Sequence, residues 1–308
     1  MQIDLEKMLE KIRGTQWALA DFDWDAPGRE LVTENEELWP KLKEFMADLT
    51  WIEHVGARGF AALAKNAPND TLKQIYTYFH AEEQRHANAE LALMRRWGML
   101  EDGEIPEPNT NLRLAIEWLD THADHVPLEA LASIIPTLEV ALDGALCKFL
   151  LETVDDPLCH EVFEKINADE ARHLGVGFHV LEMQGHGPLY QNVLKTLGAT
   201  LHPRLLLGVL IYLPLLNRMR DNLVELGLSE EKLYKALAKF RRIGGTPDGR
   251  RNPWFHILAT HSDWVSQRET WWYHKPVDLM VKLSDYYPKQ LFKPVPGWVK
   301  QLTWRPTV

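Results

Sequence analysis

The chain has 308 residues, of which 45% are hydrophobic and 25% are charged, and its formal net charge is −10. This composition provides enough apolar residues for a large core, and its acidic balance argues against a broad nucleic-acid-binding face. The two cysteines, Cys147 and Cys159, form neither a disulfide framework nor a CxxC pair, so we expect a reducing, cytoplasmic setting.

The first part of the chain predicts two long helices. Residues 1–32 form an N-terminal segment in which charged and apolar residues mix, without the apolar core of a secretory signal. A helix is predicted over 33–65, with Thr33 as a suitable N-cap. A second helix is predicted over 69–97, with Gly98 as its stop.

The pattern continues with further helices and few strand signals, so an all-α fold is predicted. A short helix is expected over 111–123, a third long helix over 127–154, and a fourth from Pro157, in its first turn, to about Gly185. The four long helices would form one bundle over 33–185.

Residues 186–308 predict a C-terminal helical extension that packs on the bundle. Its apolar run at 205–216, interrupted by Pro214, is shorter than the roughly 20 residues that a membrane-spanning helix needs. We therefore predict no transmembrane segment. The run fits a buried helix, a membrane-surface anchor or the wall of an apolar substrate channel.

One short motif occurs twice inside the helical pattern. Residues 81–86 read AEEQRH and residues 168–173 read ADEARH. If consecutive long helices pair as antiparallel hairpins, one glutamate in each earlier helix lies at the height of the motif glutamate, because an α-helix rises 1.5 Å per residue. These matched pairs are Glu53 with Glu83, and Glu139 with Glu170.

The motif histidines stand one turn after their glutamates, on the same helix face. Four carboxylates and two imidazoles would thus converge in an apolar core, where an anionic cluster is costly to bury without cations. Carboxylates with few imidazoles and no thiolate suit iron or manganese better than structural zinc. The predicted metal ligands are Glu53, Glu83, His86, Glu139, Glu170 and His173.

The other charged residues of the motif have a predicted role beside the ligands. Metal-bound histidines usually donate their second N–H to a carboxylate. Pseudo-twofold symmetry would let Asp169 orient His86 and let Glu82 orient His173, across the bundle. Two arginines, Arg85 and Arg172, would pair with these acids; ordinary surface charge is the alternative.

At these residues the sequence resembles the di-iron carboxylate proteins of the ferritin-like superfamily, and the two motifs are most similar to those of soluble acyl-carrier-protein desaturases and bacterial monooxygenase hydroxylases. The resemblance covers about 33–184. It implies a ferritin-like four-helix bundle with added C-terminal helices. It also implies two Fe ions, or a Mn/Fe pair, with O2 as co-substrate and electrons from a reductase or ferredoxin.

Three positions depart from relatives within that superfamily. Glu90 stands where many ribonucleotide reductase subunits carry a radical tyrosine, which argues against such a subunit. Ile166 stands where arylamine N-oxygenases carry an extra histidine, which weakens that reading. Asp143 lies near the position of a threonine in many desaturases and monooxygenases, and would either relay protons as a catalytic residue or hydrogen-bond a ligand.

The sequence therefore predicts a non-haem di-iron oxidoreductase that oxidises a hydrophobic small molecule or acyl chain by desaturation, hydroxylation or N-oxygenation. The alternative is a ferroxidase of the ferritin type. The extension over 186–308 favours the oxidase, because ferritin-type chains are close to a bare bundle. We expect a homodimer.

Overall fold

The computed structural model describes residues 3–126, most of 128–136, 150–184, 203–227, 271–293 and a few positions between 231 and 265. Throughout these ranges the regular structure is helical and contains no strand, which confirms the predicted all-α fold. The predicted residues Glu139 and Asp143 lie outside the described residues.

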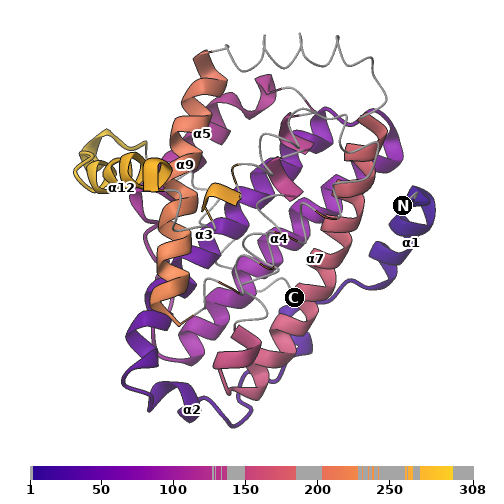
Figure 1. Ribbon diagram of the computed structural model, residues 1–308. Helices are drawn as coiled ribbons and strands as arrows, with labels where there is room; N and C mark the ends of the chain where they lie inside the picture. The colour runs from indigo at the N-terminus through magenta and orange to yellow at the C-terminus, as the bar shows by residue number, and fades with distance from the viewer. Residues whose placement is uncertain are drawn as a thin grey trace.

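The N-terminal segment forms short helices along the bundle. Helix α1 (Leu5–Gly14) starts at Asp4, whose carboxylate accepts hydrogen bonds from two backbone N–H groups of the first turn. The turn η1 (Leu19–Asp21) and the short helix α2 (Glu30–Thr33) follow. Helix α1 packs against α4 at the side of the bundle, whereas α2 lies at one end of it and contacts α3 (Figure 1).

Two long helices form the central hairpin, α3 (Leu38–Lys65) and α4 (Asp70–Arg96). The Asn69 side chain accepts a hydrogen bond from the Leu72 N–H and so caps the start of α4. At the other end of α4, Gly98 has a φ of 66°, the left-handed conformation that ends many helices. Gly98 was predicted as this stop.

The first long helix begins later than the sequence indicated. Residues Glu30–Thr33 form the separate helix α2, and α3 begins at Leu38. The Asn35 side chain accepts a hydrogen bond from the Leu38 N–H, which starts a new helix there. Pro40 follows in the first turn of α3, where a proline is tolerated because it interrupts no helical hydrogen bond.

Helix α7 (Pro157–Gln184) runs beside α4 (Figure 1). Its start is fixed by the buried Asp156, which accepts a hydrogen bond from the Leu158 N–H. Asp156 also accepts hydrogen bonds from Arg96 Nε at 2.9 Å and Trp97 Nε1 at 2.8 Å. The end of α4 is thereby tied to the start of α7, which sets the height of one helix against the other.

The remaining helices cover the outer side of α3. Helix α5 (Thr110–His122), with the turn η2 (Ala123–His125), packs on α3; α9 (Pro203–Glu225) packs on α5, and α12 (Trp271–Asp285) packs on α9. The turn η4 (Lys289–Leu291) follows. Among the described helices, none is both long enough and apolar enough to cross a membrane.

The apolar core consists of two clusters of buried side chains. One cluster ends at Phe79 on α4 and at Val176 on α7. The other cluster ends at Ala89 on α4 and at Ile166 on α7. The two repeated motifs lie between these limits. The polar centre of the bundle thus lies between two apolar layers, away from solvent.

Candidate metal centre

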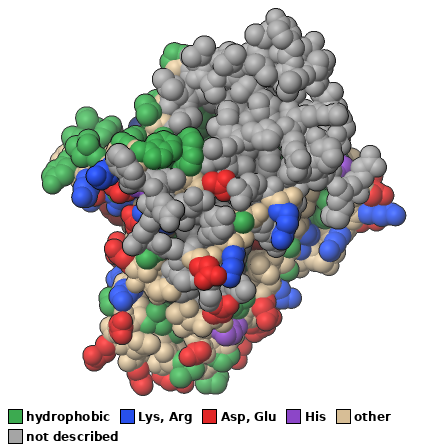
Figure 2. Space-filling model, viewed as in Figure 1, with side chains coloured by type: hydrophobic (Ala, Val, Ile, Leu, Met, Phe, Trp, Pro, Cys, Tyr) green, Lys and Arg blue, Asp and Glu red, His purple; other side chains and the backbone are tan. Residues whose placement is uncertain are grey.

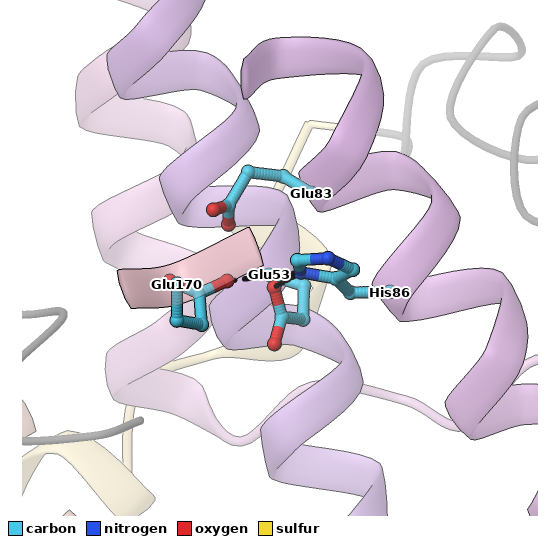
Figure 3. Close-up of side chains that lie close together, drawn as sticks. All are labelled: Glu53, Glu83, His86 and Glu170. Atoms are coloured by element: carbon cyan, nitrogen blue, oxygen red, sulfur yellow. Dashed lines mark ion pairs between the residues drawn. The ribbon is translucent and has the colours of Figure 1, made fainter. Parts of the chain in front are cut away.

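Four predicted ligands from three helices converge in the bundle. Glu53 comes from α3, Glu83 and His86 from α4, and Glu170 from α7; all four are buried. One ligand atom from each lies within 4.8 Å of those of the other three. Figure 3 shows the three carboxylates and the imidazole pointing toward one another.

The fifth described ligand, His173, faces the same carboxylates. Its Nδ1 lies 3.0 Å from Glu83 Oε1 and 3.1 Å from Glu170 Oε2. On the other side, His86 Nδ1 lies 3.0 Å from Glu170 Oε1 and 3.4 Å from Glu53 Oε2. Glu170 therefore directs one oxygen toward each histidine, so it could contribute to the binding of both ions of a metal pair.

The second ring nitrogen of each histidine contacts an acid from the opposite motif. His86 Nε2 lies 3.1 Å from Asp169 Oδ2, and His173 Nε2 lies 3.0 Å from Glu82 Oε2. Both acids are buried. The structure thus brings together the crosswise pairs that the motif symmetry suggested, and each Nδ1 faces inward.

The motif arginines neutralise these outer acids. Arg172 donates to Glu82 Oε1 at 3.1 Å and also contacts Asp169, while Arg85 donates to Asp169 at 3.0 Å. Burial alone would raise the pKa of Asp169. The hydrogen bond from His86 and the charges of both arginines instead hold that pKa below its usual range.

Two residues of the N-terminal segment also reach the outer acids, and the sequence gave no sign of them. Trp17 donates its indole N–H to Asp169 at 2.8 Å, and Gln16 donates its amide to Glu82 at 2.6 Å. The Trp17 ring also lies under the Arg85 guanidinium, 4.6 Å from its centroid. The segment before α2 is thus part of the centre.

The donor set fits a pair of cations. Burial lowers the pKa of His86, but its hydrogen bonds to Asp169, Glu170 and Glu53 outweigh this and hold the pKa well above its ordinary value. Without metal, that proton partly offsets the inner carboxylates; a metal ion would take its place. Both motif arginines are engaged with the outer acids.

A further buried carboxyl, Glu90, lies close to the ligands. Its side chain has no exposed surface, and neither oxygen has a hydrogen-bond partner of normal geometry among the described residues. Burial, followed by the charge of Glu53, raises its pKa well above the ordinary value. From the sequence, this position showed only that a tyrosine was absent.

Replacing Glu90 with glutamine is expected to stabilise the metal-free protein by about 1–3 kcal/mol at neutral pH. The raised pKa of Glu90 means that the folded state loses stability as pH rises above the ordinary glutamate value of about 4.3. The neutral amide removes that loss. In urea unfolding with a chelator, the gain should be larger near about pH 8 than near about pH 5.

The exposed Glu36 provides the matched control for this comparison. A Glu36→Gln variant should follow the wild-type stability at both pH values. An equal effect of Glu90→Gln at both pH values would show that the pKa of Glu90 in the folded protein is not raised above its value in the unfolded chain.

A glycine of α3 makes room for one of the ligands. A Cβ atom built on Gly56 would lie 2.1 Å from Glu83 Oε2 and 2.8 Å from Glu83 Cδ. No side chain larger than hydrogen therefore fits there while Glu83 keeps its position. The sequence gave no signal for this contact, because it depends on how closely α3 and α4 approach.

The comparison with solved structures agrees with this architecture. The other two comparisons found nothing: no family model and no curated protein matches the sequence. Among solved structures, two variants of an R2-like ligand-binding oxidase with an anaerobically reconstituted Mn/Fe cofactor match with a TM-score of 0.52 and 12% identity. Each match covers 91% of this chain and 93% of the other. The chain therefore has the ferritin-like fold, as the resemblance of its repeated motif implied.

Proposed function

We propose that this protein is a di-metal oxidase that uses O2 to oxidise an organic substrate. The observation that carries the proposal is the convergence of buried carboxylates and two inward-facing Nδ1 atoms between the apolar layers. The oxidases that share the fold carry a Mn/Fe cofactor, which supports two Fe ions or a Mn/Fe pair here. The ligands would be Glu53, Glu83, His86, Glu139, Glu170 and His173.

Such a metal pair, when bound, supplies the redox chemistry with O2. The chain's own residues prepare the site for it. Glu82 and Asp169 contact Nε2 of the two histidines, so each Nδ1 would be available to bind a metal. The arginines keep these acids ionised, and the apolar layers exclude water. Asp143 remains the proposed proton carrier or hydrogen-bond partner of a ligand.

The proposed substrate is a hydrophobic small molecule or an acyl chain, oxidised by desaturation, hydroxylation or N-oxygenation. A reductase or ferredoxin would supply electrons, and the working form would be a homodimer. The structure has a cavity of about 800 Å³ whose lining includes Trp51, Arg113, Arg218 and Phe292 but none of the proposed ligands. We do not assign it as the site of oxidation.

The proposal is tested by O2 uptake. Protein loaded anaerobically with Fe(II), or with Fe(II) and Mn(II), is supplied with a chemical reductant and with panels of fatty-acyl and arylamine compounds. O2 uptake should rise with one substrate class and yield its oxidised product, and His173→Ala should abolish the rise. Uptake that follows added Fe(II) alone and deposits ferric mineral would instead identify a ferroxidase.

A further inference from the structure

Helix α12 carries an exposed apolar stripe on its outer face. Three side chains on the helix and one directly after it recur at three-, four- and seven-residue spacing, which places them on one face. They are Trp272, Leu279, Leu283 and Tyr286, with exposed fractions of 51%, 56%, 60% and 84%. The helix projects from the side of the molecule (Figure 1), and hydrophobic side chains gather on it (Figure 2).

The inner face of α12 holds the helix to the body of the protein. Tyr273 and Val277 are buried there. Both acids of α12 have partners on α9: Asp278 accepts a hydrogen bond from Asn217 at 2.9 Å, and Asp285, whose side chain is 54% exposed, forms an ion pair with Arg218. Helix α12 therefore has two distinct faces, one buried against the body and one exposed that carries the apolar stripe.

Three exposed lysines lie beside the stripe. Lys275 and Lys282 are exposed next to it on α12, and Lys289 is exposed in η4. Figure 2 shows basic side chains next to the hydrophobic ones. Because Asp278 is hydrogen-bonded to Asn217 and the charge of Asp285 is balanced by Arg218, the lysines give the outer face apolar and cationic groups in a chain whose net charge is −10.

We propose that the outer face of α12 docks the protein on the surface of a membrane that contains anionic lipid. Trp272 and Tyr286 stand near the two ends of the stripe, and such rings favour the interface between headgroups and acyl chains. Leucines that enter the acyl boundary and lysines that meet lipid phosphates complete an interfacial helix. The helix lies along the surface rather than across it.

A second copy of the chain fits this face less well. A twofold interface pairs the same patch of both subunits, so the lysines of one copy would face those of the other. Lipid phosphates provide the opposite charge. The inference goes beyond the proposed oxidation and does not depend on metal binding, so either can fail without the other.

Vesicle co-sedimentation of the full chain tests the inference. Vesicles made of equal parts of phosphatidylcholine and phosphatidylglycerol should bind the protein, and vesicles of phosphatidylcholine alone should bind at least tenfold less. The double variant L279E/L283E and the single variant K282E should each lower binding to the mixed vesicles at least tenfold. The control Leu31→Glu changes a leucine of α2 that is 52% exposed and should bind as the wild type does.

All variants are on exposed positions, and unchanged circular dichroism shows that they remain folded. Equal binding by wild type and L279E/L283E would overturn the proposal. So would failure of the wild type to bind the mixed vesicles. If light scattering then shows a dimer that L279E/L283E converts into a monomer, the face is a contact between copies.

Discussion

Replacing Glu170 with alanine is expected to empty both metal positions. Its two oxygens lie 3.0 Å from His86 Nδ1 and 3.1 Å from His173 Nδ1, so this carboxylate faces both histidines. Removing an acid that only orients a ligand typically costs about 10- to 100-fold in metal affinity. If Glu170 contributes to both ions, its loss should cost at least about 100-fold at each position, and substrate-dependent O2 uptake should fall to background.

The measurement is metal content per chain after anaerobic loading and desalting. The matched control is Glu164→Ala, which removes an exposed glutamate from the same helix and should retain both metals. Asp169→Asn is expected to lower metal content less than Glu170→Ala does, because among the described pairs Asp169 contacts His86 and not His173. A Glu170→Ala protein that still holds two metals would place the metal site elsewhere in the molecule.

A Gly56→Ala variant is expected to fold well and yet bind metal at least tenfold more weakly. Alanine favours a helix interior over glycine by about 1 kcal/mol, so the metal-free protein should be as stable as the wild type or more stable. The new methyl group would lie 2.1 Å from Glu83 Oε2, however. The flexible Glu83 side chain is what must move, and its carboxylate then leaves the ligand position.

The test compares two measurements with opposite expected signs, thermal unfolding with a chelator and metal affinity by titration. Gly14→Ala is the control, because no heavy atom lies within 4 Å of the Cβ that it adds. Unchanged metal affinity in Gly56→Ala would mean that Glu83 is not held to this position when metal binds. A large loss of stability without metal would mean that the backbone, not the carboxylate, gives way.

The sequence was sufficient to predict the fold and the core of the centre because both depend on helix geometry. A fixed rise per residue and a short turn place Glu53 opposite Glu83 whatever the details of packing. The repeated motif then predicted that His86 and Asp169 would meet. The motif residues face the centre of the bundle from α4 and α7. The hydrogen bonds of Asp156 fix the position of these two helices relative to each other along their axes.

What the sequence did not show depends on contacts between distant segments. Trp17 reaches Asp169 from the N-terminal segment, and Gly56 matters only because Glu83 packs against it. Neither contact leaves a periodic pattern. The predicted start of the first long helix at Thr33 was wrong: Thr33 ends the short helix α2, and α3 begins at Leu38, whose N–H donates to the Asn35 side chain.

The crosswise pairing of the two motifs has an evolutionary consequence. Each motif supplies the acid that holds the histidine of the other, through Asp169 with His86 and Glu82 with His173. A substitution of the acid in either motif therefore removes a contact of the histidine in the other motif. We therefore expect substitutions in the two motifs to be coupled, so that a change in one copy alters what the other copy tolerates.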